Sequence, residues 1–231
     1  MGRDVEDPRT GLTGKERAAI KATWAIFQAN HSEQAAVVFV DMFTEYPEYK
    51  IIFKEFRHMD AVSMASSPKL IKHATAIVYT LTTFIETMDR PDVMTDLIKK
   101  NASDHINRKG VTPLHIRNFT KLLRERVEKV AAEKMDEDAR TGWEKFVTLF
   151  INATAQTYVD AGVCTLDTAF TGVLDKGATD STRSPGIGSP TRSPTPELGS
   201  PWSAPSGATS PRQGVSSQKR PKSSANKQRK S

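Results

Sequence analysis

Residues 67–88 read SPKLIKHATAIVYTLTTFIETM, and this stretch decides the fold class. Its apolar side chains recur at intervals of three and four residues, which places them on one face of an α-helix. Pro68 lies just inside the predicted start, where proline is favoured because the first turn leaves its N–H groups unpaired anyway. The positions that form this apolar face are Leu70, Ala74, Ile77, Val78, Leu81, Phe84, Ile85 and Met88.

The sequence on either side of this stretch predicts further helices and no strands. Thr112 precedes Pro113 as a plausible N-cap of one helix. The basic residues before Gly110, and Gly110 itself, are typical of the C-terminal end of the preceding helix. No segment alternates apolar and polar residues with period two, so nothing indicates a half-buried sheet. We therefore predict an all-α domain of six main helices and short turns. The five further helices are expected at 13–29, 32–46, 91–107, 113–133 and 136–160.

Composition divides the chain into a folded part and a tail. Apolar residues make up 37% of the chain, below the ~45–50% usual in globular domains. The deficit is concentrated in residues 176–231, which are rich in serine and proline and cannot bury enough apolar surface to offset the entropy lost on ordering. We expect a flexible N-terminus at 1–11, one folded domain at 12–163 and a disordered, basic tail at 164–231.

Charge and cysteine content exclude several classes of protein. The tail from residue 176 has ten Lys and Arg against two Asp and Glu, so the net charge of +6 does not mark the folded part as nucleic-acid-binding. A single cysteine, Cys164, excludes a disulfide framework and a cysteine-based zinc site, and it favours a reducing compartment. The sequence shows no signal-peptide pattern and no apolar run long enough to be a transmembrane segment, so we expect a cytoplasmic protein.

Two histidines lie on predicted core helices. His73 is four residues before Ile77 on the same helical face, and His105 lies near the end of the next long helix. Taken alone, each is more simply explained as a buried or surface histidine with an ordinary hydrogen-bond partner. The residues that lie at particular spacings from the two histidines change this interpretation.

Over residues 12–162, the sequence resembles the globin family. Pro47 is followed six residues later by Phe53 and then by Phe56, as in the short third globin helix and the corner after it. His105 precedes the corner at 111–113 by six residues, and His73 matches the distal histidine. The residues that carry the resemblance are Leu12, Thr13, Trp24, Pro47, Phe53, Phe56, His73, Ile77, His105, Val111, Thr112, Pro113 and Trp143.

The resemblance implies a globin fold of six to eight helices around a pocket for haem b. It makes His105 the proximal iron ligand, and His73 either a hydrogen-bond donor to dioxygen or a second, displaceable ligand. A neutral imidazole is the axial ligand that globins use. The 31 residues between the two histidines leave room for a helix, a reversal and a second helix. The expected apolar walls are Phe39, Phe53, Phe56, Ile77, Val111 and Ile116.

The chain departs from the family pattern at two positions. Asn101 stands four residues before His105, where leucine is usual, and Ala76 replaces a basic residue that often meets a haem propionate. The propionates therefore need other partners, and the candidates are Lys72, Arg108 and Lys109. We interpret the remaining histidines, His31, His58 and His115, as surface or capping residues, although His58 could approach a propionate.

Function remains open between three hypotheses. The first is reversible binding of dioxygen, or of other small diatomic ligands, for storage, facilitated diffusion or transport, which is not an enzymatic activity. The second is a redox enzyme acting on nitric oxide, nitrite or peroxide; it needs an external reductase, because no G-x-G-x-x-G motif follows a predicted strand. The third is a haem-based oxygen or redox sensor that signals through its tail.

The tail carries two motifs of its own. Its six Ser/Thr-Pro pairs indicate contact with proline-directed kinases, and an ordinary serine- and proline-rich linker explains them equally well. The basic clusters at 219–222 and 227–230 predict nuclear localisation or attachment to an anionic surface such as a membrane, and a solvated basic end is the alternative. The pairs begin at Ser184, Ser189, Ser193, Thr195, Ser200 and Ser210.

Overall fold

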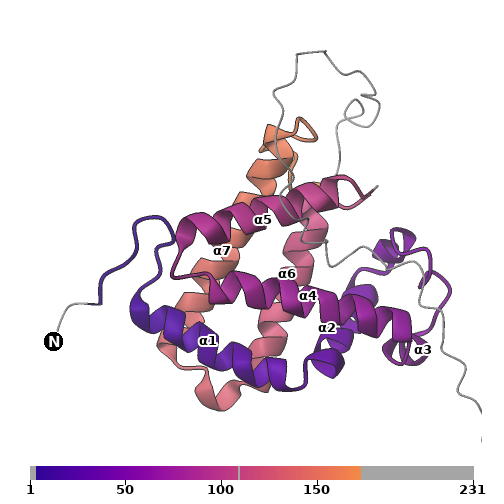
Figure 1. Ribbon diagram of the computed structural model, residues 1–231. Coiled ribbons are helices and arrows are strands. Elements are labelled where there is room, and N and C mark those ends of the chain that lie inside the picture. The colour runs from indigo at the N-terminus through magenta and orange to yellow at the C-terminus, as the bar shows by residue number, and fades with distance from the viewer. Residues whose placement is uncertain (1–3, 109, 173–231) are drawn as a thin grey trace, which may run out of the picture. The chain divides into compact units, whose positions relative to one another are not determined.

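The computed structural model describes residues 4–108 and 110–172, and within these ranges it is built from helices without strands (Figure 1). The all-α prediction is confirmed, and each of the six predicted helices appears with its ends within three residues of the expected positions. The α-helices are α1 Gly14–Ala29, α2 His31–Glu45, α3 Ala61–Ala65, α4 Pro68–Glu86, α5 Pro91–Ile106, α6 Pro113–Val130 and α7 Glu137–Asp160, with 3₁₀ turns η1 Pro47–Ile51 and η2 Ala132–Lys134.

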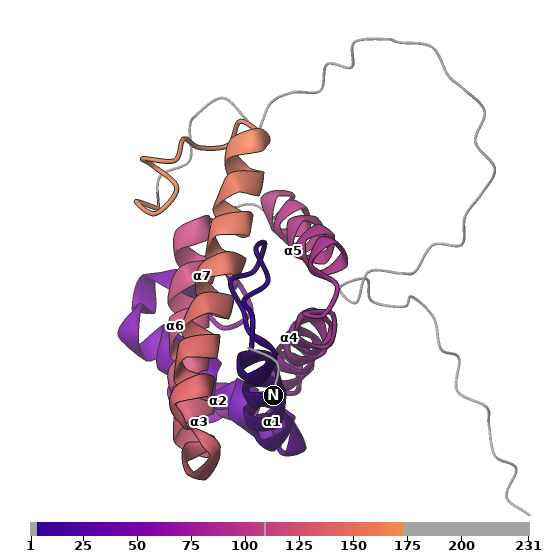
Figure 2. The same cartoon turned by 90° about the vertical axis from the view of Figure 1, so that its left-hand side faces the viewer.

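The helices form two crossed layers. In Figure 1, α1, α4 and α5 run across the view in front of α6 and α7, which stand nearly upright. Figure 2 shows the same arrangement from the side, with α6 and α7 next to each other and α4 and α5 on the opposite side. The two helices that carry the histidines of interest, α4 and α5, therefore belong to one layer and meet at a shared corner, residues 87–90.

The core of the two layers is fixed by a close crossing of α1 and α7. A Cβ atom at Gly142 would lie 3.1 Å from Glu16 Cβ, so glycine lets the two backbones approach. Nearby, Trp143 Nε1 donates to Thr23 Oγ1 at 2.9 Å, and Trp24 Nε1 donates to Thr82 Oγ1 at 2.9 Å. Both indole N–H groups are thus satisfied inside the core, and α1 is tied to both α7 and α4.

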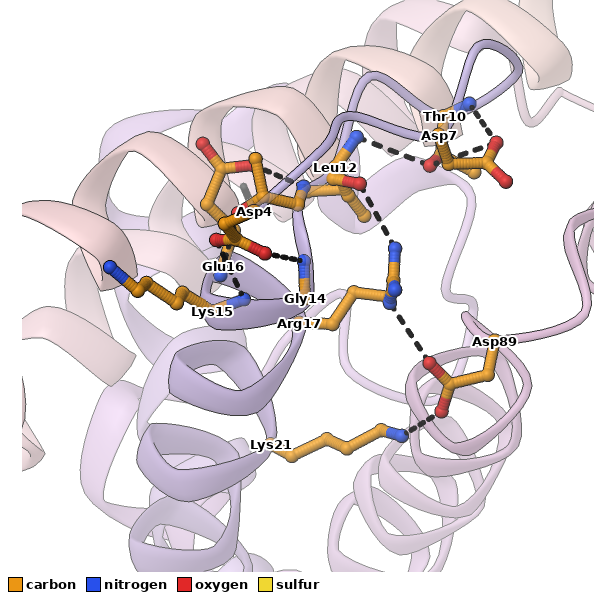
Figure 3. A network of polar contacts seen from close by, with 11 residues as sticks. Asp4, Asp7, Thr10, Leu12, Gly14, Lys15, Glu16, Arg17, Lys21 and Asp89 are labelled. Carbon is orange, nitrogen blue, oxygen red and sulfur yellow. Dashed lines mark hydrogen bonds and ion pairs between the residues drawn. The ribbon is translucent and has the colours of Figure 1, made fainter. Parts of the chain in front are cut away.

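The N-terminal segment is more ordered than the sequence predicts. Residues 1–11 were expected to be flexible, but Asp4 accepts hydrogen bonds from the N–H groups of Gly14 and Lys15, at 2.9 and 3.2 Å (Figure 3). Asp7 and Leu12 close a turn, in which Asp7 N–H donates to Leu12 O at 3.0 Å. The Asp4 carboxylate satisfies N–H groups that the first turn of α1 leaves unpaired, which is why this segment holds to the domain.

Ion pairs tie the same region to the corner between α4 and α5. Arg17 Nε lies 2.9 Å from Asp89 Oδ1, and Lys21 pairs with the other oxygen of Asp89 (Figure 3). Arg9 pairs with Asp92 at the start of α5. The hydrogen bond from Lys21 and the nearby Arg17 charge hold the pKa of Asp89 below its ordinary value. The corner is therefore anchored to α1 by charge.

Replacing Asp89 with asparagine is expected to lower the free energy of unfolding at pH 7 by about 0.5–1 kcal/mol, the upper range for exposed ion pairs. Because the folded state lowers the pKa of Asp89, its contribution is complete above the unfolded pKa of about 3.9 and is lost as the pH falls through the folded pKa. The difference between Asp89→Asn and wild type should therefore vanish at acid pH. Urea unfolding at pH 7 and near pH 3 measures it, with Asp96→Asn, on an exposed face of α5, as the control. Equal losses in the free energy of unfolding for both variants would show that the ion pairs of Asp89 do not anchor the corner.

The folded part also extends beyond its predicted C-terminal boundary. The sequence places the start of the disordered tail at residue 164, but Cys164 and Ala169 are buried, with exposed fractions of 4% and 1%. These short apolar side chains pack in a second hydrophobic cluster beside the main core. The predictions made for the rest of the tail, from residue 173, lie outside the described residues. None of the helices in the described part of the chain is long and apolar enough to cross a membrane.

Candidate functional site

His73 lies on α4 among aromatic side chains. The edges of Phe39, on α2, and Phe53, after η1, meet its ring at centroid distances of 5.1 and 5.7 Å. Burial is the main cause that lowers the pKa of His73 to about 4, and the nearby positive charge of Arg108 acts in the same direction. The imidazole is therefore neutral at physiological pH.

Phe39 and Phe53 belong to a larger aromatic cluster beside this histidine. Phe39 packs against Phe119 at 5.0 Å and against Phe53 at 6.0 Å, and Phe43 packs against Phe53 at 5.2 Å and Phe56 at 6.3 Å. The rings come from α2, from the segment after η1 and from α6. Together they make a wall of low polarity beside His73, which keeps water away from whatever binds there.

His105 lies in the last turn of α5, and a backbone carbonyl fixes its tautomer. Its Nδ1 atom is 2.7 Å from Asn101 O. A carbonyl oxygen only accepts hydrogen bonds, so the proton is on Nδ1 and the lone pair is on Nε2. Burial lowers the pKa of His105, and the Asn101 carbonyl opposes that shift. His105 is thus a neutral, oriented imidazole, which is the form that ligates metals.

The fold brings the two histidines together. They are carried by α4 and α5, which contact each other, and both imidazoles are half-buried. Among residues 4–108 and 110–172, no group of three or more His, Cys, Asp or Glu side chains is placed to hold a metal ion. Two imidazoles alone suit the axial positions of a metal that arrives with its own equatorial ligands, as in a metal macrocycle.

A family model supplies the decisive comparison. The model described as Globin matches residues 36–154, a range that contains both histidines and the whole aromatic cluster. This chain belongs to the globin family. Membership supports a haem cofactor.

Individual relatives agree with the family assignment. A globin of Nerita albicilla is 30% identical over 146 residues, which cover 63% of this chain and 92% of that protein. Cytoglobin-1 of Oryzias latipes is 24% identical over 152 residues, covering 65% of this chain and 86% of that protein. The crystal structure of a hexacoordinated haem protein from an anhydrobiotic tardigrade, determined at pH 4, shares the fold at 16% identity and a TM-score of 0.62, covering 66% of this chain and 99% of that one.

In this globin, the residues expected to line the pocket differ in their burial and in their contacts. Ile77 is half-buried against the main core, and Ile116 contacts both hydrophobic clusters. Val111 is half-buried, and its carbonyl accepts a hydrogen bond from Tyr158 Oη at 3.2 Å. Of the side chains named for the apolar wall, Phe39 and Phe53 contact His73, while Val111 and Ile116 lie at and just after the corner that follows His105.

The three candidates for propionate contacts differ in position. Lys72 is exposed on α4, next to His73. Arg108 is half-buried, its pKa is lowered by burial, and its charge reaches His73. Lys109 lies outside the described residues. Of the two described candidates, Arg108 is therefore the one whose burial and charge fit a residue of the pocket.

The other histidines have local roles. His115 Nδ1 accepts a hydrogen bond from Thr112 N–H at 3.1 Å, which caps α6, and its ring packs on Tyr49 at 4.2 Å. His31 Nδ1 lies 3.1 Å from Gln28 O, at the turn between α1 and α2, and His58 is exposed. The interpretation of these residues as capping or surface histidines agrees with these positions.

Sequence reasoning missed two aromatic residues of the site. Phe43 and Phe119 both contact rings of the wall, Phe43 through Phe53 and Phe119 through Phe39. A signal was present for each, because Phe43 lies one helical turn after Phe39 and Phe119 is on the apolar face expected for 113–133. Without the positions of α2 and α6, neither could be distinguished from ordinary core.

Proposed function

We propose that this globin binds haem b through His105 and takes up dioxygen reversibly. The observation that carries the proposal is the pair of neutral, half-buried imidazoles on α4 and α5, one of them oriented by a backbone carbonyl and the other in contact with the rings of Phe39 and Phe53. Membership of the globin family supports a haem cofactor. That this haem is haem b is part of the proposal. Storage, facilitated diffusion or transport of dioxygen, without catalysis, follows as the role.

The chain's own groups fit this cofactor. Ferrous haem, when bound, would supply an iron centre able to bind a diatomic ligand, and His105 would hold that iron. His105 offers Nε2 on the side of the ring opposite its bond to Asn101 O. Phe39, Phe53 and Phe56 would exclude water from the haem pocket, and Ile77, Val111 and Ile116 would form the rest of its apolar wall. Arg108 is the favoured propionate partner, with Lys72 and Lys109 as further candidates.

His73 supports two variants of the proposal. As a neutral imidazole it can donate one N–H to a polarised ligand in the pocket, or it can itself occupy the second axial position until a ligand displaces it. An ultraviolet–visible spectrum of the deoxygenated ferrous protein tests both, because five- and six-coordinate haem differ in their visible bands. A purified protein that takes up no haem would overturn the proposal as a whole.

The rate of autoxidation distinguishes the enzymatic alternative from storage of dioxygen. Storage of dioxygen needs a ferrous form that oxidises slowly, whereas turnover of nitric oxide, nitrite or peroxide tolerates rapid oxidation if an external reductase restores the ferrous state. A haem-based sensor would instead change the contacts of its tail when a ligand binds. We propose dioxygen binding first because the apolar wall around His73 excludes water, which slows oxidation.

We further propose a cytoplasmic protein whose tail makes charge-dependent contacts with an anionic surface, either membrane or nucleic acid, and with proline-directed kinases. The support is the sequence of the tail, with net charge +8 from residue 176 onward and six Ser/Thr-Pro pairs. Each phosphate adds about −1.5 to −2 charges, so six would take the tail from +8 to about −1 to −4.

A chain ending at residue 175 is expected to keep the dioxygen affinity of the full chain, because the part removed contains almost no large apolar side chains. The full chain should be retained on anionic vesicles at low salt and released by phosphorylation or by moderate salt, and the truncated chain should not be retained. Oxygen equilibrium curves and vesicle co-sedimentation measure the two effects. A several-fold change in affinity on truncation would show that the tail acts on the globin domain. Equal retention of all three forms would show that the basic clusters are only a solvated end.

A further inference from the structure

The chain continues beyond α7 into a short folded segment, residues 163–172, here called the C-terminal cap. Val163 N–H donates to Tyr158 O at 3.0 Å, which turns the chain at the end of α7. Ala169 N–H donates to Thr165 O at 2.9 Å, and Thr165 N–H donates to Thr168 Oγ1 at 2.9 Å. In Figure 2 this segment bends from the end of α7 toward the side on which α6 lies. The cap therefore has its own hydrogen-bonded shape.

The cap buries an apolar face against three helices. Its residues Val163, Cys164 and Ala169 belong to a hydrophobic cluster separate from the main core. The same cluster contains Ala102 and Ile106 from α5, Ile116 from α6, and Ala155, Tyr158 and Val159 from α7. Ala169 is 1% exposed, so no space remains there for a larger or charged side chain.

Two further contacts attach the cap to the beginning of α6. The guanidinium of Arg117 lies over the ring of Phe170, 5.0 Å from its centroid, which is a cation–π geometry. Gly172 has a φ of +80°, and a Cβ atom there would lie 3.1 Å from Leu114 Cδ2. The backbone of the cap thus passes directly over the first turn of α6.

The helices that the cap covers lead directly to His105. Ala102 and Ile106 are one turn apart on the face of α5 that joins the cluster, and His105 lies within that same turn. Beyond His105, Arg108 N–H donates to His105 O at 2.9 Å, and the corner then runs through Val111 into α6. The last turn of α5 and the first turns of α6 therefore share one apolar support.

We propose that the C-terminal cap is a positioning element for His105, which holds the last turn of α5 and the start of α6 in the register that orients the imidazole. The proposal rests on the proposed function in that His105 is the axial ligand. The proposal also divides the region that was predicted to be a single tail. It assigns a role in orienting His105 to residues 163–172 and assigns no such role to the residues from 176 onward.

Three chain lengths test this division: the full chain, a chain ending at 175, and a chain ending at 162. Amide hydrogen exchange of residues 102–116, measured without haem, is expected to be at least tenfold faster in the chain ending at 162 and unchanged in the chain ending at 175. Residues 14–45, on α1 and α2, serve as the internal control because they lie outside the cluster. In the haem-loaded ferrous protein, resonance Raman should show a shifted or broadened iron–histidine band only for the shortest chain.

A matched pair of substitutions tests the buried face without shortening the chain. Ala169→Glu places a carboxylate at a position that is 1% exposed, and Leu166→Glu places the same group in the same segment at a position that is 63% exposed. The first should reproduce the faster exchange at 102–116 and the altered iron–histidine band, and the second should leave both unchanged. If Ala169→Glu unfolds the whole domain, Phe170→Ala replaces it, because this variant removes the contact with Arg117 and adds no charge.

Exchange that rises equally at 14–45 and 102–116 would overturn the proposal, because the cap would then contribute only to global stability. Unchanged exchange in all cap variants would overturn it as well. The exchange experiment needs no haem, so it tests the link between the cap and the turn of His105 even if the proposed function fails. Failure of that function would be seen separately, as a full-length protein that does not bind haem.

Discussion

A His105→Ala protein is expected to lose normal retention of haem. The substitution removes the imidazole that the Asn101 carbonyl orients, and no other side chain in that turn of α5 can replace it as an axial ligand. Added imidazole should restore a histidine-type spectrum, because the cavity left by the side chain has the volume of the free ligand. The measurement is haem transfer to an acceptor protein, followed in the Soret band with and without imidazole.

The matched control for His105→Ala is His31→Ala, which removes an equal side chain at the turn between α1 and α2. It should retain haem as the wild type does. A His105→Ala protein that holds haem with an unchanged spectrum would show that another residue is the axial ligand, and the whole assignment of the site would be wrong.

Replacing His73 with leucine is expected to raise the dissociation rate of dioxygen by about 2- to 20-fold. A hydrogen bond from a neutral imidazole contributes roughly 0.5–1.5 kcal/mol net, and more where charge gathers on the acceptor, while about 1.4 kcal/mol corresponds to a factor of ten. Leucine keeps an apolar volume against Phe39 and Phe53, so the effect isolates the lost donor. Stopped-flow displacement measures the rate.

His73→Gln is the informative companion variant, because glutamine keeps an N–H donor and should lie between leucine and wild type. If His73 occupies the second axial position at rest, both substitutions should instead speed ligand association, which flash photolysis detects. Unchanged association and dissociation rates in His73→Leu would mean that the side chain does not act on the ligand.

The fold was predictable because its signals are local. The apolar periodicity in 67–88 defines α4 through neighbours three and four residues apart, and the other long helices follow the same rule. The two histidines were singled out for another reason. Their spacing to Phe53 and Val111 matches the pattern of the globin family, and this resemblance needs no knowledge of the packing.

What the sequence could not predict depends on backbone groups and on contacts that only the folded chain brings together. Asn101 was noted as a polar departure, but the group that contacts His105 is its backbone carbonyl, which every residue possesses. Asp4 looks like any charged residue near a terminus until the first turn of α1 meets it. The cap is the extreme case, since three short buried side chains spread over seven residues, Val163 to Ala169, produce no periodic signal.

The paired tryptophans of the core give this protein a built-in optical reporter. Trp24 and Trp143 have ring centroids 6.0 Å apart, and each is only 2% exposed, so their emission should be shifted to the blue and should move to the red on unfolding. A porphyrin absorbs in the range where indole emits, so occupancy of the pocket should quench the same signal. The chain contains three tryptophans, and the third, Trp202, lies in the tail. A chain ending at residue 175 therefore carries fluorescence from the globin core alone, so one titration curve follows cofactor loading and one melting curve follows folding.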